Sequence, residues 1–187
     1  MNFDVKKYWD NRYKGRPAGS GFSSHDPFWV KFKTETVNKF IVDNGVSTVL
    51  DMGCGDGNIL DKFNGYENYC GIDVSDVTIS NVAKKYKRSN REFFTYDNIP
   101  DKKFDLVLSL DVLYHIVNIS DFNNYLDIAA DKCNQYFVVL STNKVEPCPR
   151  HIEHREFIPH VEKRGFVLLD NFPKDNDLQF YIFEKEK

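Results

Sequence analysis

Short apolar runs alternate along the chain with stretches in which hydrophobic residues recur every three or four positions. The short runs predict buried strands, and the spacing of three to four predicts helices. We expect strands over residues 48–52, 69–75, 92–96, 104–111, 135–142, 166–170 and 178–183. We expect helices over residues 4–15, 28–44, 59–63, 76–83, 120–133 and 153–164. Strands separated by helices are typical of an α/β fold with a mostly parallel sheet.

The size and composition fit one domain over residues 1–187. The chain has 187 residues, of which 41% are hydrophobic and 28% charged, as in ordinary soluble proteins. We expect an N-terminal helix and loop over residues 1–27 and the core over 28–187. The loop, residues 15–27, is rich in Gly, Pro and Ser, and it is either a lid or a connector.

The net charge and the length of the apolar runs argue against nucleic-acid and membrane partners. A net charge of -3 argues against a broad nucleic-acid-binding surface, although it allows a local basic patch. The first residues lack the apolar core of a signal peptide, and no run approaches the ~18 residues of a membrane span. The four cysteines contain no C-x-x-C pair, and we expect Cys54 and Cys70 to be buried apolar fillers. A cytoplasmic protein is therefore expected.

The most informative stretch follows the strand predicted at residues 48–52. Three glycines at alternate positions, Gly53, Gly55 and Gly57, come directly after it, and a helical pattern follows. Such a turn lets a ligand lie against the backbone and requires positive φ at some positions. The spacing is not the G-x-G-x-x-G of dinucleotide sites, and Asp51 stands just before it, which disfavours phosphate and suits a ligand with positive charge. A plain turn between two elements is the alternative interpretation.

These residues resemble motif I of the class I S-adenosylmethionine (SAM)-dependent methyltransferases. The opening W-x-x-R-Y and S-G segment resembles the N-terminus of small bacterial and phage members. SAM carries an ammonium and a sulfonium and no phosphate, as the acid before the loop requires. The stretch from Phe104 to His115 also resembles the family, at F-D-x-V and at D-V-L-x-H. The resemblance implies a seven-stranded, mostly parallel, doubly wound sheet with a C-terminal antiparallel hairpin and helices on both faces.

The resemblance also implies the cofactor contacts. Asp73 ends the second strand about 20 residues after the glycines, where a carboxylate accepts from the ribose hydroxyls, although an aspartate that caps a helix is the alternative. Asp97 matches the acid at the adenine amino group, or else belongs to a turn. The full predicted set is Arg12, Asp51, Gly53, Cys54, Gly55, Gly57, Asp73, Val74, Asp97, Asn98 and Asp111.

Two further groups of residues are candidates for the acceptor chemistry. His115 follows the fourth strand and is the candidate general base, with Tyr114 as its neighbour; a wall of the adenine pocket is the alternative role for His115. After the fifth strand come four side chains that can carry positive charge, and they predict an anionic acceptor: Arg150, His151, His154 and Arg155. A solvated helix start would also explain them. A metal site at His151 and His154 lacks further evident ligands, so no metal is expected.

The resulting hypothesis is a methyltransferase that moves a methyl group from SAM to a small, anionic acceptor, leaving S-adenosylhomocysteine (SAH). An RNA, DNA or protein methyltransferase is the runner-up, although no N/D-P-P-Y motif follows the fourth strand. A SAM-binding module without turnover and a nicotinamide dehydrogenase are two further hypotheses. The sequence does not predict the oligomeric state.

Overall fold

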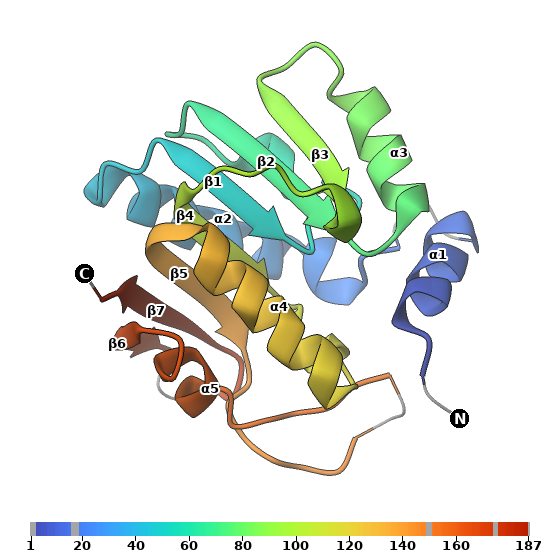
Figure 1. Cartoon of the computed structure of the whole chain (residues 1–187). Helices are drawn as coiled ribbons and strands as arrows, with labels where there is room; N and C mark the ends of the chain where they lie inside the picture. The colour runs from blue at the N-terminus through green and yellow to red at the C-terminus, as the bar shows by residue number, and fades with distance from the viewer. Residues whose placement is uncertain (1–2, 16–18, 149–150, 174–175, 187) are drawn as a thin grey trace. The chain divides into compact units, whose positions relative to one another are not determined.

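The strands belong to a seven-stranded sheet. The computed structural model describes residues 3–15, 19–148, 151–173 and 176–186 (Figure 1). The strand order is β3-β2-β1-β4-β5-β7-β6. The strands are β1 (Thr48–Met52), β2 (Asn68–Asp73), β3 (Arg91–Thr95), β4 (Phe104–Leu110), β5 (Cys133–Ser141), β6 (Phe166–Phe172) and β7 (Gln179–Lys185). β7 runs antiparallel to both β5 and β6. The predicted sheet with a C-terminal antiparallel hairpin is therefore confirmed.

Among the described residues, two α-helices precede β1 and three lie between later strands along the chain. The α-helices are α1 (Val5–Gly15), α2 (Pro27–Asp43), α3 (Asp76–Lys85), α4 (Ile119–Lys132) and α5 (Ile158–Glu162). Four 3-10 turns accompany them: η1 (Phe22–Ser24), η2 (Leu60–Lys62), η3 (Tyr96–Asn98) and η4 (Leu113–His115).

The contacts divide the chain into two compact units, which we name by their content. The glycine-loop unit comprises Lys6–Val49 and Gly53–Pro100, and the C-terminal unit comprises Met1–Val5, Leu50–Met52 and Asp101–Lys187. Each unit is described by itself below, and the single domain over residues 1–187 stays a prediction.

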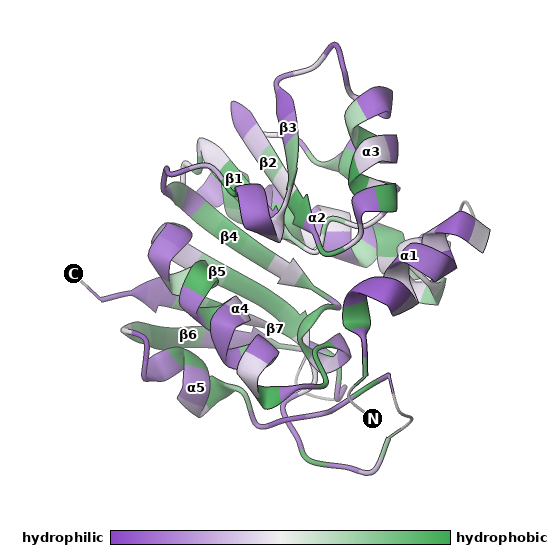
Figure 2. Cartoon of the chain, turned by 45° about the vertical axis from the view of Figure 1, so that its right-hand side comes forward, coloured by the Kyte–Doolittle hydropathy of each residue, from purple (hydrophilic) through white to green (hydrophobic). Residues whose placement is uncertain are grey.

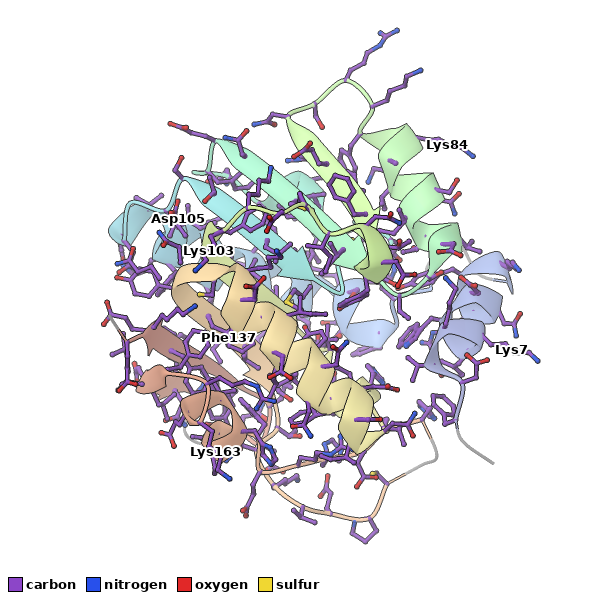
Figure 3. The ribbon with its side chains drawn as sticks, in the orientation of Figure 1. Lys7, Lys84, Lys103, Asp105, Phe137 and Lys163 are labelled. Carbon is purple, nitrogen blue, oxygen red and sulfur yellow. The ribbon has the colours of Figure 1, made fainter. Side chains whose placement is uncertain are left out.

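In the glycine-loop unit, side-chain caps set where the helices begin. Asp26 precedes α2 and its Oδ1 accepts from the backbone N–H groups of Phe28 and Trp29. Ser75 precedes α3 and its hydroxyl accepts from Thr78 N–H. Such caps satisfy N–H groups that have no partner inside the helix. α3 packs on β2 and β3, which pair in parallel. Lys7 and Lys84 extend outward from α1 and α3 (Figure 3).

The C-terminal unit has an aromatic core. β5 is largely hydrophobic (Figure 2), and Phe137, labelled in Figure 3, is buried on this strand. Its ring lies 5.8 Å from that of Phe166 and 6.2 Å from that of Phe183. The three rings come from β5, β6 and β7, so they join the parallel part of this unit to its antiparallel hairpin. Buried rings of this size supply much of the apolar burial that stabilises a domain.

A buried hydroxyl pair in the C-terminal unit yields a stability prediction. Tyr125 of α4 is buried, and its hydroxyl lies 2.9 Å from Met52 O and 2.7 Å from Ser109 Oγ. Tyr125→Phe removes the buried hydroxyl that links these two oxygens, so the free energy of unfolding should fall by about 1–3 kcal/mol. Urea unfolding followed by circular dichroism measures this. The control is Tyr66→Phe at a half-buried site, which should lower the free energy of unfolding by less than about 1 kcal/mol. Equal losses in the two variants would contradict a stabilising role for the buried Tyr125 hydroxyl.

Two predicted helices differ from the structure. Over residues 59–63 the chain forms only the 3-10 turn η2, so no long helix presents its N-terminus to the glycine loop. Over residues 153–164 only α5 is helical. Arg155 donates to the backbone carbonyls of Ile116 and Val117, and these bonds hold the residues before α5 in a non-helical path. The alternative interpretation of these cations as a solvated helix start therefore does not hold for Arg155.

Candidate functional site

The glycine loop adopts the backbone that its sequence predicts. Gly53, Gly55 and Gly57 have φ values of 94°, 56° and 67°, all in the region that side chains rarely enter. The N–H groups of Gly53 and Cys54 donate to Ile72 O at 2.7 and 3.0 Å. The loop is thereby fixed to the end of β2.

Asp73, at the end of β2, fastens the same loop by its side chain. Its Oδ2 accepts from Gly55 N–H at 3.1 Å, and its Oδ1 accepts from Ser75 N–H at 2.9 Å. Burial raises the pKa of Asp73 to about 6, against the opposing effect of these hydrogen bonds. Each carboxylate oxygen can accept more than one hydrogen bond, so the group can also receive hydroxyl donors.

Residues 19–25 lie on the glycine loop within the same unit. Ser20 Oγ accepts from Asp56 N–H at 3.0 Å, while Asp56 Oδ2 lies 3.3 Å from Ser20 N and 3.1 Å from His25 Nε2. Asn58 Nδ2 donates to Ser24 O at 2.5 Å. We name the described residues 6–15 and 19–25 the N-terminal strap. The strap contacts the loop directly, and its role as a lid stays a prediction.

The strap is also attached at the start of α3. Ser75 Oγ lies 2.6 Å from Asp10 Oδ1, and Lys6 pairs with Asp76 at 2.7 Å. Tyr13 is buried and its hydroxyl lies 3.1 Å from Ser20 Oγ. Burial, and next the negative charge of Asp73, raise the pKa of Tyr13 well above its usual value, so the phenol stays protonated.

The other predicted cofactor residues of the glycine-loop unit occupy different settings. Arg12 donates from Nε to Gly19 O at 2.6 Å and from Nη1 to Tyr8 at 3.1 Å, so it holds the strap together. Cys54 is buried, whereas Asp97 and Asn98 are exposed in η3. Val74 is half-buried, and its carbonyl lies 3.4 Å from Lys6 Nζ.

In the C-terminal unit, Asp51 is a buried carboxylate of β1. Asp111, directly after β4, has φ of 61°, and among the described residues it is the one non-glycine with positive φ. Its Oδ1 accepts from the Tyr114 hydroxyl at 2.9 Å. Burial, and then the Asp111 charge, raise the pKa of Tyr114 well above its usual value. Tyr114 therefore donates to Asp111 and is poorly suited to act as a base. A strained backbone at a polar position often marks a functional site.

The predicted acceptor residues come together beside Tyr114. Its ring centroid lies 4.6 Å from that of His115 and 5.7 Å from that of His154. The rings of His115 and His151 lie 6.3 Å apart and are nearly parallel, at 15°. Glu153 N–H donates to Tyr114 O at 2.8 Å, which fixes this segment to the η4 turn.

Arg155 has a different setting from the three histidines. Its Nη1 donates to Ile116 O at 2.6 Å, its Nη2 donates to Val117 O, and the guanidinium lies over the Phe122 ring at 5.0 Å. Burial lowers the pKa of Arg155. These contacts show a structural role, whereas anion binding by Arg155 stays a prediction. Arg150 lies outside the described residues.

Several residues of the site were not predicted as functional. Ser20 forms hydrogen bonds with Asp56 and Tyr13 at the glycine loop. Thr142 and Glu146 contact the predicted residue His154. Ser20 and Asp56 are 36 positions apart, so no local pattern joins them. Only the Gly and Ser content of the strap, with a charged residue inside the glycine motif, could have pointed to that contact.

Two further findings concern the described residues alone. No helix among them is both long and apolar enough to cross a membrane. The same part of the chain contains no cluster of three or more His, Cys, Asp or Glu side chains arranged to hold a metal ion.

A protein-family comparison matches most of the chain. A family model described as a methyltransferase domain matches residues 28–169. The chain belongs to this methyltransferase family. The match includes the glycine loop, Asp73 and the stretch from Asp111 to His154, so the predicted resemblance is confirmed.

Solved methyltransferase structures share the fold. N-methyltransferase NodS from Bradyrhizobium japonicum WM9 in complex with SAH has a TM-score of 0.77 and 17% identity, with 99% of this chain and 100% of that chain covered. Magnesium protoporphyrin IX methyltransferase from Synechocystis PCC 6803 with bound SAM has a TM-score of 0.72 and 16% identity, with 100% and 99% covered. At these identities the likeness concerns the fold alone.

Curated methyltransferases match over parts of their length. The mitochondrial ubiquinone biosynthesis O-methyltransferase of Dictyostelium discoideum is 24% identical over 186 residues, which is 84% of this chain and 57% of that protein. The mRNA cap guanine-N(7) methyltransferase of Schizosaccharomyces pombe is 40% identical over 47 residues, which is 24% of this chain and 13% of that protein. The chain thus spans less than two thirds of these relatives.

Proposed function

We propose that this methyltransferase domain transfers a methyl group from SAM to a small-molecule acceptor. The observation that carries the cofactor assignment is the pair of carboxylates at the glycine loop, those of Asp73 and Asp56. Asp73 is ionised above about pH 6, and burial, followed by the charges of Asp73 and Asp56, raises the pKa of Tyr13. A negative field at a backbone cradle favours a cationic ligand over a phosphate. Relatives of this fold are crystallised with SAM or SAH, which supports the proposal.

The residues present fit the cofactor. Asp73 lies at the glycine loop, where its carboxylate accepts from Gly55 N–H and can also accept from two ribose hydroxyls. The cofactor supplies a methyl group activated on a sulfonium. The protein then has to orient the acceptor, exclude water and remove a proton where the acceptor is neutral. The other proposed cofactor contacts are Arg12, Asp51, Gly53, Cys54, Val74, Asp97, Asn98 and Asp111.

The acceptor assignment is the finer part of the proposal. Relatives named for porphyrin methylation and ubiquinone biosynthesis support a small molecule. An anionic group on it would meet side chains that can carry positive charge, namely Arg150, His151, His154 and Arg155. His115 is the sequence-derived candidate base, and the raised pKa of Tyr114 favours an imidazole over that phenol. The proposal keeps the cytoplasm as the compartment that the sequence predicts, and Cys54, Cys70 and Cys133 are buried residues.

RNA is the second candidate acceptor, because cap methyltransferases match a short stretch of the chain. Labelled methyl transfer from SAM into a metabolite extract and into an RNA pool distinguishes the two. Label in small molecules alone supports the proposal, and label in RNA alone replaces it. A SAM-binding module without turnover would label neither pool.

A thermal-shift measurement tests the cofactor assignment. SAH should raise the melting temperature of the wild type, whereas NAD should not. Gly53→Arg should abolish the shift, because φ at Gly53 is 94° and a long side chain would enter the cradle. A shift with NAD and none with SAH would favour a dehydrogenase instead.

A further inference from the structure

A chain of three polar side chains lies in the C-terminal unit, and none of its contacts is explained by the fold alone. His154 Nδ1 lies 2.6 Å from the hydroxyl oxygen of Thr142. His154 Nε2 lies 3.4 Å from Glu146 Oε1. Thr142 is buried at the end of β5, and the His154 side chain is 15% exposed. Both ring nitrogens therefore face a defined protein group.

This arrangement satisfies the imidazole in both of its charge states. Because a carboxylate only accepts, the nearby Glu146 favours a neutral ring with its hydrogen on Nε2, and Nδ1 then accepts from the Thr142 hydroxyl. When the ring is protonated, the hydroxyl rotates and accepts from Nδ1–H instead. The carboxylate then stabilises the positive charge. His154 can thus gain a proton without leaving a buried group unpaired.

Other charged and titratable groups around His154 are arranged consistently with this. Lys144 pairs with Glu146 at 2.9 Å and with Asp177 at 2.5 Å, which holds the carboxylate in place. The Tyr114 ring contacts the rings of both His154 and His115, and its hydroxyl donates to Asp111. The linked side chains of Thr142, His154 and Glu146 are therefore close to the residues proposed to meet the acceptor.

We propose that Thr142 relays the proton released by the acceptor to His154, which takes it up. Glu146 is the positioning residue. The proposal rests on the proposed methyltransferase function. The lone pair of a neutral O–H or N–H nucleophile forms the new bond to the methyl carbon, and the electron pair of the broken carbon–sulfur bond stays on sulfur. The nucleophile's proton moves to Thr142 Oγ1 as the hydroxyl's own proton moves to His154 Nδ1. The acceptor class is therefore a neutral hydroxyl or amine rather than a group already ionised.

This assignment moves the role of base from His115 to His154. His115 Nδ1 lies 3.3 Å from His151 O, a carbonyl that only accepts, so this contact fixes the His115 ring. His154, by contrast, has a carboxylate at one nitrogen and a proton-exchanging hydroxyl at the other. A base supported in this way contributes about 10²–10⁴-fold to a proton-transfer step.

The first experiment needs no acceptor. Long-range ¹H–¹⁵N NMR of the ligand-free protein, with the ring nitrogens labelled, reports the tautomer of neutral His154. The wild type should show hydrogen on Nε2, and both Thr142→Val and Glu146→Gln should give a mixture of tautomers. Thr142→Ser should retain the wild-type form. Hydrogen on Nδ1 in the wild type would overturn the proposal.

The second experiment measures transfer of labelled methyl from SAM into a low-molecular-weight metabolite extract. Thr142→Val and Glu146→Gln should each reduce transfer by about 10–100-fold, and Thr142→Ser should recover it. Thr34→Val is the matched control, because Thr34 is also buried and its hydroxyl donates only within α2 at 2.8 and 3.2 Å. That control should leave transfer within about threefold of the wild type.

Calorimetric binding of SAH distinguishes the two proposals. Wild type and the Thr142 and Glu146 variants should bind SAH with Kd values within about threefold of each other. No SAH binding by the wild type would overturn the methyltransferase proposal itself. Normal SAH binding with full transfer by Thr142→Val and Glu146→Gln, and loss of transfer only in His115→Gln, would overturn the proton path through His154.

Discussion

Replacing Asp73 by alanine is expected to weaken SAH binding by at least about 100-fold, because two hydrogen bonds to an ionised acceptor are lost at about 1.5–3 kcal/mol each. The Asp73 carboxylate also fixes Gly55 N–H and Ser75 N–H, so the glycine loop loses its attachment in the same variant. Isothermal titration calorimetry at pH 8 measures the change in Kd. Asp73→Asn retains the size of the side chain and should show the same direction of change.

The control for this variant lies three residues further along. Asp76 is exposed, pairs with Lys6 at 2.7 Å and begins α3. Asp76→Ala removes the same charge from the same unit, and SAH binding should stay within about threefold of the wild type, since exposed pairs contribute about 0–1 kcal/mol. Equal losses in the Asp73 and Asp76 variants would show that the general negative field, rather than a contact with Asp73, holds the ligand.

The raised pKa of Asp73 gives this prediction a pH dependence. Its folded-state pKa of about 6 exceeds the ordinary pKa of 3.8, so its contribution to stability is present at low pH and is lost as the pH rises through about 6. Ligand binding should have the opposite trend, because the ionised carboxylate accepts hydroxyl hydrogen bonds more strongly. We expect SAH affinity to fall as the pH is lowered through about 6, and calorimetry from about pH 5 to 8 measures it. Any residual binding by Asp73→Ala should lack this step.

The sequence was sufficient for the strands, for the glycine-loop backbone and for the position of Asp73 beside it. The strand at 48–52 matches β1, because a short apolar run between polar residues has few alternatives to a buried strand. The positive φ values of Gly53, Gly55 and Gly57 follow from the motif, because only glycine adopts them readily. Asp73 was placed by its distance along the chain from the loop, and the structure brings the two together.

The remaining features depend on contacts between distant residues. The apolar spacing at residues 59–63 is that of a helix, but the chain forms only the turn η2, because Asn64 and Gly65 follow immediately and Gly65 adopts φ of 87°. The residues before α5 avoid a helix because Arg155 donates to carbonyls 38 and 39 positions away. The link between Thr142 and His154 likewise joins the end of β5 to a later segment. No local pattern contains such information.

Gly55→Ala is expected to reduce the free energy of unfolding by about 1–3 kcal/mol and to weaken SAH binding by more than about tenfold. At φ of 56° a side chain is strained, and an added Cβ would lie 2.4 Å from Ser20 Oγ and 3.2 Å from the Tyr13 hydroxyl. The N-terminal strap must therefore move away from the glycine loop. Urea unfolding and calorimetry with SAH measure the two effects.

Gly45→Ala is the control that separates backbone strain at positive φ from a steric collision of the added Cβ. Gly45 has φ of 62°, and nothing lies within 4 Å of the position its Cβ would take. The Gly45→Ala variant should lose about 1 kcal/mol of unfolding free energy from backbone strain alone, and its SAH binding should be unchanged. The double variant Gly55→Ala with Ser20→Gly removes the colliding hydroxyl, so it should be less destabilised than the sum of its single changes. Strict additivity would mean that Ser20 does not press on the loop, and the strap would then have no direct role at the cofactor cradle.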